Sequence, residues 1–372
     1  MMQHQNQVRG SLIGGAIGDA LGEPIEFALE STIFSKYGEK GLTQYLLNAY
    51  TGTAVISDDT QMTLFTAYGL LQADTARAMG DTEITAVDGV TQAYLNWLLT
   101  QFSSYDEVHA EVPDEDNCWL MRVPELYARR APGATCISSL RTIREGDVVK
   151  NHSKGCGGVM RVAPVALRYN EDVDYATLDK LGGNVAAITH KHSLGYMSAA
   201  AQTHILRGII YRDMPLREAV VDARDVMQIL YAGDKHLQEL VDILNLALDL
   251  STNDASDLDN IHNIGEGWVA EENLGIAVYC ALRYEDDFSN GIVAAVNHGG
   301  DADSTGAVAG NILGALCGYD AIEEKWKKDL ELHDVIVALA DDLARPCPVS
   351  QENPDADPVW MDRYGGKRLE TE

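Results

Sequence analysis

Glycine recurs at every fourth position in two segments at opposite ends of the 372-residue chain. The first series is Gly10, Gly14, Gly18 and Gly22, and the second is Ala302, Gly306, Gly310, Gly314 and Gly318. Residues four apart lie on one face of an α-helix, so each segment predicts a helix with a smooth ridge. Glycine inside a helix costs on the order of 1 kcal/mol relative to alanine, a cost that close backbone packing can offset. We therefore expect the two helices to pack against each other in the core. The alternative is that the glycines are only small core residues with other partners.

The loop before the second helix carries the densest set of reactive groups in the chain. The segment Asn297–Gly306 contains two carboxylates, two hydroxyls and three glycines. We expect Asp303 or Ser304 to be the N-cap of the helix. Asp301 and Asp303 are too close in sequence to share a helix face, but in a turn entering a helix their oxygens can converge on one point. The simplest occupant of that point is a hard cation, and the alternative is an ordinary capped helix in a solvated loop.

A second acidic segment, Ser57-Asp58-Asp59-Thr60, precedes another amphipathic helical pattern. Adjacent Asp side chains repel each other unless a positive charge lies between them. Two such caps in one chain predict a shared, oxygen-rich metal site, and four Asp without a nearby Cys favour magnesium or manganese over zinc. If the first helix packs as expected, its end, with Asp19, Glu23 and Glu26, lies near this site.

Helical patterns follow one another along the chain, and no run alternates convincingly with period two. We predict helices at about 58–79, 90–98, 175–188, 194–211, 215–232, 235–250, 268–284 and 321–343, and loops at 28–56 and 103–117. The fold class is therefore all-α, with a single domain over residues 1–344. The tail, residues 345–372, holds four of the ten prolines. We expect it to be extended and docked by Trp360 or Tyr364, or partly disordered.

The net charge of -29 opposes binding to nucleic acid or to an anionic membrane. The six cysteines form no Cys-x-x-Cys pair, which favours reduced thiols and a cytoplasmic location. The sequence of the first residues predicts neither a signal peptide nor a spanning helix.

A second glycine-rich loop spans residues 154–161 and lets the backbone approach a phosphate or a ribose closely. This signal is weak alone, because the loop lacks the spacing of the known nucleotide-binding motifs. His190 and His192 lie between two predicted helices. Pocket-lining or structural roles fit them better than zinc ligation, since no thiolate is near.

Taken in order, the motifs resemble the ADP-ribosylglycohydrolase family, which includes the dinitrogenase reductase-activating glycohydrolase and the ADP-ribosyl-acceptor hydrolases. The resemblance covers nearly the whole chain. Its motifs are Gly14 to Gly22 with Glu26, Ser57-Asp58-Asp59-Thr60, Gly155 to Pro164, Thr189-His190, Gly267 to Glu272, and Gly300 to Ser304.

The resemblance implies an all-helical orthogonal fold that holds two magnesium ions, with manganese as a substitute. The implied metal ligands are Ser57, Asp58, Asp59, Asp301, Asp303 and Ser304, and the implied catalytic residues are Glu26, Asp58 and Asp303. Residues implied to contact ADP-ribose are Gly155, Cys156, Gly157, Gly158, His190, His298, Gly299 and Gly300.

The implied reaction is hydrolysis of the bond at ribose C1 of an ADP-ribosylated protein, which releases ADP-ribose. The negative charge of the chain would steer an arginine-bearing target toward it, so arginine linkages are favoured and serine linkages are the second choice. An additional Asp implicated in arginine-directed members has no unique match among Asp88, Asp106, Asp114 and Asp116. Competing interpretations are an immunity protein that neutralises an ADP-ribosylating toxin and a non-catalytic ADP-ribose binder or structural protein. Retention of all four Asp argues against an inactive relative.

Overall fold

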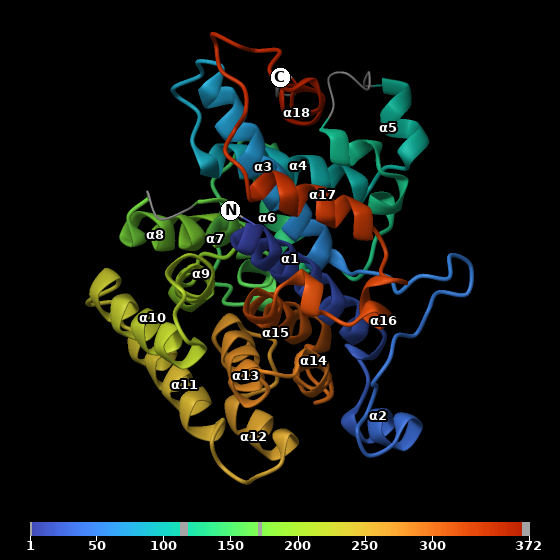
Figure 1. Ribbon diagram of the computed structural model, residues 1–372, viewed down its shortest axis with the longest axis vertical. Helices are drawn as coiled ribbons and strands as arrows, with labels where there is room; N and C mark the ends of the chain where they lie inside the picture. The colour runs from blue at the N-terminus through green and yellow to red at the C-terminus, as the bar shows by residue number, and fades with distance from the viewer. Residues whose placement is uncertain (1, 112–117, 170–172, 367–372) are drawn as a thin grey trace.

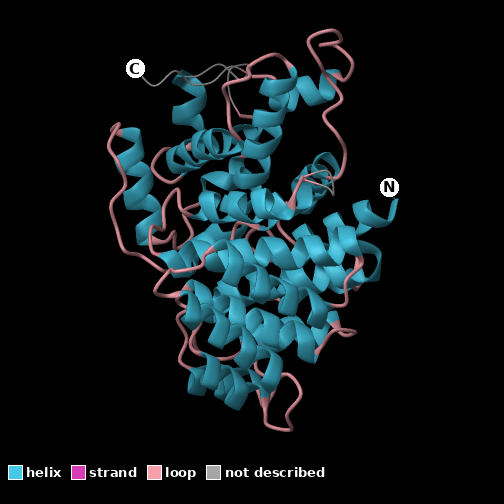
Figure 2. Cartoon of the chain, turned by 90° about the vertical axis from the view of Figure 1, so that its left-hand side faces the viewer, coloured by secondary structure: helices cyan, strands magenta, loops and turns pink. Residues whose placement is uncertain are grey.

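The computed structural model describes residues 2–111, 118–169 and 173–366 (Figure 1). Within these ranges the chain forms eighteen α-helices and no β-strand, only isolated bridges. Figure 2 shows helices joined by loops throughout the described chain. The helices are α1 (Met2–Gly22), α2 (Glu30–Tyr37), α3 (Asp58–Ala78), α4 (Ala86–Thr100), α5 (Tyr105–Glu111), α6 (Ala134–Arg144), α7 (Ala163–Arg168), α8 (Tyr175–Ala186), α9 (Ser193–Arg212), α10 (Leu216–Leu230), α11 (Leu237–Leu250), α12 (Asp257–Ile264), α13 (Ala270–Arg283), α14 (Phe288–Val296), α15 (Ala302–Cys317), α16 (Glu324–Lys327), α17 (His333–Leu343) and α18 (Pro358–Tyr364). The predicted all-α fold is confirmed.

Helices α1 and α15 lie side by side at the centre of the molecule (Figure 1). Their glycines face one another across the whole contact: a Cβ added at Gly10, Gly14 or Gly18 would overlap the carbonyl oxygen of the glycine opposite it on α15. Only hydrogen at these positions lets the two backbones come so close. The packing predicted from the four-residue spacing is therefore confirmed.

The other helices surround this central pair. Helices α3, α13 and α14 pack against it, and α9 packs against α8, α10 and α13. Helix α9 is buried from Ser193 to Tyr211 except at the half-buried Tyr196, whereas α10 buries only one face. None of the described helices is long and apolar enough to cross a membrane.

Several short helices differ from the expected loops. The segments predicted to be loops at 28–56 and 103–117 contain α2 and α5, and the single helix predicted at 321–343 is two helices, α16 and α17. The second of these begins after Leu332, whose φ of 56° interrupts the helix. The predicted set of helices does not include α6, α7, α12, α14 or α18. Helices α2, α5, α12 and α14 have only two or three turns, too few for a periodic pattern to stand out.

The tail docks on α3. Trp360 is fully buried and donates a hydrogen bond of 2.8 Å from Nε1 to the Thr75 hydroxyl. The Tyr364 hydroxyl donates to Asp342 at 2.8 Å. Docking is therefore confirmed for the described part of the tail, but the expected extended conformation is wrong for residues 358–364, which form α18. Residues 367–372 lie outside the described part of the chain.

Candidate metal centre and active site

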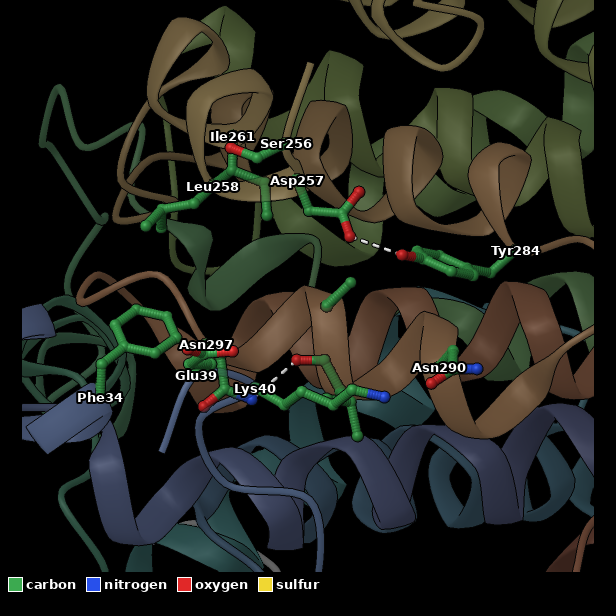
Figure 3. A pocket seen from close by; sticks show the side chains of 12 residues that line it. Phe34, Glu39, Lys40, Ser256, Asp257, Leu258, Ile261, Tyr284, Asn290 and Asn297 are labelled. Atoms are coloured by element: carbon green, nitrogen blue, oxygen red, sulfur yellow. Dashed lines mark hydrogen bonds between the residues drawn. The ribbon is translucent and has the colours of Figure 1, made fainter. Parts of the chain in front are cut away.

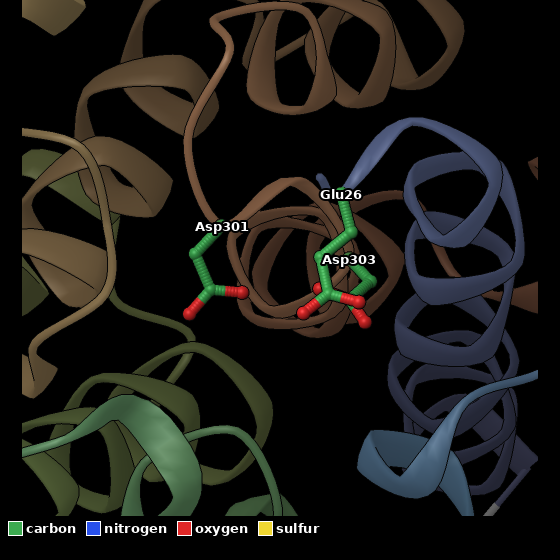
Figure 4. Close-up of side chains that lie close together, drawn as sticks. All are labelled: Glu26, Asp301 and Asp303. Carbon is green, nitrogen blue, oxygen red and sulfur yellow. The ribbon is translucent and has the colours of Figure 1, made fainter. Parts of the chain in front are cut away.

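Acidic side chains from three distant segments meet at one end of the α1–α15 pair. Glu26 follows the short 3-10 helix η1 (Glu23–Ile25) at the end of α1, while Asp301 and Asp303 lie at the start of α15. Oxygen atoms of these three carboxylates all lie within 4.8 Å of one another (Figure 4). The glycine contacts set this geometry, because they fix the end of α1 against the start of α15.

The start of α3 is the third segment. Ser57 is its N-cap, and the Ser57 hydroxyl accepts a hydrogen bond of 3.1 Å from the Asp59 backbone N–H. Asp19 of α1 accepts from the backbone N–H groups of Ser57 at 3.0 Å and Thr60 at 3.1 Å. Asp19 therefore fastens the start of α3 to the central pair. Asp58 accepts from the Gly133 N–H at 3.3 Å, so the segment between η4 (Pro124–Tyr127) and α6 also borders the site.

The start of α15 corrects one prediction, because the N-cap is Asp301 rather than Asp303 or Ser304. The Asp301 N–H donates to the Glu266 carbonyl at 2.8 Å, which holds this residue outside the helix. The hydroxyl of Thr305 donates to the Asp301 carbonyl at 2.7 Å. The helix therefore begins two residues earlier than expected, and Asp303 lies in its first turn.

The loop before α15 is shaped from within by His298. This side chain is buried, its Nε2 is hydrogen-bonded to the Thr305 hydroxyl at 2.9 Å, and its Nδ1 accepts from the Gly300 N–H at 3.2 Å. Gly299 has a φ of 73° and lies against Glu30, and a Cβ at Gly300 would overlap the Glu266 carbonyl. These three residues thus give the loop the shape that presents Asp301.

Burial makes the carboxylates hard to ionise. Burial, followed by repulsion from Asp303 and Asp301, raises the pKa of Glu26 to about 9. Burial, followed by repulsion from Asp303, raises the pKa of Asp19 to about 7. The same two causes raise the pKa values of Asp58, Asp59 and Asp301 well above their ordinary range, and burial raises that of Asp303.

Among the described residues, few groups compensate the charge of the cluster. In the described part of the chain no Lys or Arg forms an ion pair with Glu26 or with the four Asp at the starts of α3 and α15. One oxygen of Asp59 and one of Asp301 are buried without any hydrogen-bond partner. An unpartnered buried carboxylate oxygen is costly. Hard divalent cations take such oxygen ligands, so the residues present fit magnesium or manganese.

The glycine-rich loop lies directly on His190. A Cβ at Gly155 would lie 3.4 Å from His190 Nε2, and one at Gly157 would lie 2.9 Å from His190 Cε1. The ring is buried, and burial lowers its pKa to about 3, so it is neutral. The buried His190 ring therefore packs against the glycine-rich loop and supports it. His192 caps α9 by accepting from the Leu194 N–H at 3.2 Å, a structural role of the expected kind.

Cys156 joins this loop to the acidic cluster. The Ser304 hydroxyl lies 3.6 Å from Cys156 Sγ, and the Cys156 N–H donates to the Trp268 carbonyl at 3.2 Å. Burial raises the pKa of the Cys156 thiol well above its ordinary value, which disfavours a nucleophilic thiolate. Gly158 lies in the same 3-10 turn, η5 (Cys156–Gly158), packed against Ala186.

Two aromatic residues beside the cluster were not singled out from the sequence. The rings of Phe27 and Trp268 are stacked, with centroids 6.0 Å apart and planes 18° apart. Phe27 directly follows Glu26, and Trp268 lies two residues after Glu266, whose carbonyl holds Asp301. The only sequence signal was adjacency, because each aromatic lies inside or next to a motif.

Two of the four remaining candidate Asp residues, Asp88 and Asp106, lie in described helices and are not in the group of clustered carboxylates. Asp88 forms a capping box with Thr85 at the start of α4, and Asp106 lies in the first turn of α5. Asp114 and Asp116 lie outside the described residues.

A separate cavity of about 650 Å³ lies between α2, α12 and α14 (Figure 3). Apolar side chains such as Phe34, Ile261 and Val293 line it, and Asp257 on its wall accepts a hydrogen bond of 2.5 Å from the Tyr284 hydroxyl. None of the clustered carboxylates lines this cavity. The acidic cluster is therefore the better candidate for chemistry.

Comparison with known proteins identifies relatives over nearly the whole chain. The family model described as ADP-ribosylglycohydrolase matches residues 1–353. ADP-ribosylhydrolase ARH3 of Homo sapiens is 28% identical over 220 residues, covering 52% of this chain and 58% of that protein, so the match spans less than two thirds of that relative. The uncharacterized protein YegU of Escherichia coli is 25% identical over 342 residues, covering 87% and 92%. A solved structure titled ADP-ribosylglycohydrolase-related protein complex has a TM-score of 0.65 and 25% identity, covering 93% of this chain and 100% of that chain.

Proposed function

Because the chain belongs to the ADP-ribosylglycohydrolase family, we propose that it hydrolyses the bond at ribose C1 of an ADP-ribosylated protein and releases ADP-ribose. The observation that carries the proposal is the convergence of Glu26, Asp301 and Asp303 with the carboxylates at the start of α3. These residues come from three segments that only the folded chain brings together. An acidic residue that only caps its own helix would not need carboxylates from the other two segments.

The residues of this site divide into three proposed roles. Burial and the neighbouring Asp carboxylates raise the pKa of Glu26 to about 9. As a general acid and base, Glu26 can give a proton to the atom that leaves ribose C1, where an oxocarbenium-like state develops, and can then take one from water. We assign Asp58 and Asp303 as the other catalytic carboxylates.

The metal ligands we propose are Ser57, Asp58, Asp59, Asp301, Asp303 and Ser304. When bound there, magnesium or manganese would supply Lewis-acid chemistry that orients the ribose hydroxyls and activates water. The two unpartnered carboxylate oxygens in the cluster support this assignment.

The rest of ADP-ribose would extend along the loops that border the cluster. Gly157 and Gly158 would contact the phosphates through backbone N–H groups. Gly155 and Cys156, whose N–H groups donate to Ser153 and Trp268, would line the same channel. His190 would act through that loop, since its buried ring lies beneath it. His298, Gly299 and Gly300 would set the wall near Asp301.

The test is release of ADP-ribose from arginine-modified and serine-modified proteins incubated with the chain and magnesium, with and without a chelator. We expect release from the arginine-modified protein, no release with chelator, and slower release from the serine-modified one. Release from neither, with ADP-ribose still bound tightly, would instead establish an ADP-ribose binder without turnover. Release that resists the chelator would contradict the metal assignment.

A further inference from the structure

We propose that Phe27 and Trp268 form an aromatic subsite, beside the acidic cluster, that binds the planar guanidinium group of a modified arginine. The proposal rests on the hydrolase function proposed above and names the acceptor chemistry that the same site selects.

The first argument is exposure. Phe27 is 74% exposed and Trp268 is 38% exposed, although their rings stack on each other. The three Trp side chains at 97, 326 and 360 are by contrast buried in the core. Two large aromatic side chains held together at the surface of a site are typical of a binding surface rather than of core packing.

The second argument is position. Phe27 directly follows Glu26, whose carboxylate lies with those of Asp301 and Asp303, so its backbone adjoins this cluster. Trp268 is tied to the other side of the site, because its carbonyl accepts from the Cys156 N–H at 3.2 Å. A group leaving ribose C1 between these carboxylates would therefore pass close to the pair.

The third argument is rigidity. The backbone that carries Trp268 is fixed by Glu272, whose carboxylate accepts from the N–H groups of Glu266 at 3.0 Å and Gly267 at 3.3 Å. Gly267 has a φ of 84°, and a Cβ there would lie 2.7 Å from a methyl group of Thr305. The segment that carries Trp268 is thus preorganised, so binding should cost little conformational entropy there.

The fourth argument is charge. Glu266 and Glu272 lie on the segment that carries Trp268, and Glu30 lies against Gly299. Of these, Glu30 is hydrogen-bonded to His262 at 2.7 Å. An aromatic face next to carboxylates binds a planar cation better than a neutral group. A serine acceptor offers neither a planar group nor a charge, so the subsite favours arginine.

The experiment compares wild type with Trp268→Leu and Phe27→Leu, which keep an apolar side chain but remove the ring. We expect each change to raise KM for a guanidine-linked ADP-ribose substrate by about 3- to 30-fold, the range of a cation–π contact. KM for a serine-linked substrate and the Kd of free ADP-ribose should change less than about 2-fold. Trp268→Tyr, which restores a ring, should recover most of the loss.

Tyr50→Leu is the matched control, since Tyr50 is a 98% exposed aromatic residue in the loop before α3. It should leave both substrates unchanged. An active wild type whose preference for the guanidine-linked substrate survives Trp268→Leu and Phe27→Leu would overturn the subsite.

Failure of the hydrolase proposal is distinguishable from failure of the subsite. If wild type cleaves neither substrate, the hydrolase proposal fails, and the uncleaved guanidine-linked conjugate becomes a binding probe. Tighter binding of this conjugate than of ADP-ribose, lost in Trp268→Leu, would still support the subsite. Equal binding of the two by wild type would overturn it.

Discussion

Widening the contact between α1 and α15 by a single methyl group should damage the fold and the site to different degrees, depending on where the methyl is placed. The positions are Gly10 and Gly18, where a Cβ would overlap the carbonyl oxygens of Gly314 and Gly306. The obstacle is backbone on a helix, which cannot rotate away, so overpacking should cost about 3 kcal/mol. Alanine regains about 1 kcal/mol of helix propensity. Each variant should therefore lose about 2 kcal/mol of unfolding free energy.

The two variants should differ in metal binding. Gly306 lies one turn after Asp303, whereas Gly314 lies two turns further along α15. Pushing α1 away at Gly18 also moves Asp19, which holds the start of α3 with its proposed ligands Asp58 and Asp59. The distance of these ligands from Asp303 would change, and magnesium tolerates little departure from octahedral geometry. We expect Gly18→Ala to weaken magnesium binding at least tenfold and Gly10→Ala to leave it nearly unchanged. Chemical denaturation in chelator measures the stability, and titration calorimetry measures the affinity.

The control is Gly208→Ala in α9, where a Cβ would lie 3.3 Å from its nearest neighbours, which are side-chain atoms. Its stability should stay within about 1 kcal/mol of wild type. If Gly10→Ala and Gly18→Ala are as stable as this control, then backbone contact does not hold the pair together. If both weaken metal binding equally, the link between the glycine ridge and the site is wrong.

Four further predictions follow from the site and the tail. Asp303→Asn should abolish ADP-ribose release and keep the fold, as judged by circular dichroism, because the amide preserves the shape but removes the charge. Without metal, the folded state raises the pKa of Glu26 from 4.5 to about 9 and that of Asp19 from 3.8 to about 7. Between these values the folded state keeps protons that the unfolded state has already released. Stability should therefore fall as pH rises from about 4 to 9, and magnesium should raise the melting temperature more at pH 8 than at pH 6; an equal shift at both would contradict this. Trp360→Ala should cost about 3–5 kcal/mol. Truncation before Pro346 should lower the free energy of unfolding by at least as much but leave metal binding intact, as measured by calorimetry below the melting temperature. Loss of metal binding would contradict the proposal that residues 345–372 are an accessory to a core at 1–344.

Much of the fold could be predicted because its strongest constraints are local in sequence. The four-residue spacing of Gly10 to Gly22 indicates which face of α1 lacks side chains. A second helix can approach this face closely only if its own contact face is equally small. The N-cap at Ser57 could also be predicted from the sequence, because its hydroxyl accepts a hydrogen bond from a backbone N–H only two residues away. Such signals need no knowledge of the partner segment.

The missing parts depend on contacts between segments far apart. Asp301 is the N-cap because its backbone N–H donates a hydrogen bond to the Glu266 carbonyl, which lies far away in the sequence. The role of His190 depends on a loop that folds over it, and the stacking of Phe27 on Trp268 joins residues with no sequence relation. The capping residues Ser256 and Asp287 did mark α12 and α14, so those two helices could have been found from their caps.

Charge balance at the cluster predicts how many cations it holds. Glu26, Asp58, Asp59, Asp301 and Asp303 supply five carboxylates, while Asp19 is already engaged by the N–H groups of Ser57 and Thr60. The starts of α3 and α15 each contribute about half a positive charge from their helix dipoles. One divalent cation would leave about two negative charges uncompensated in a buried site, whereas two would bring the site close to neutral. We therefore expect calorimetry to give two magnesium ions per chain, with release of protons from the raised carboxylates on binding. A stoichiometry of one with the same proton release would show that protonated carboxylates, rather than a second ion, complete the balance.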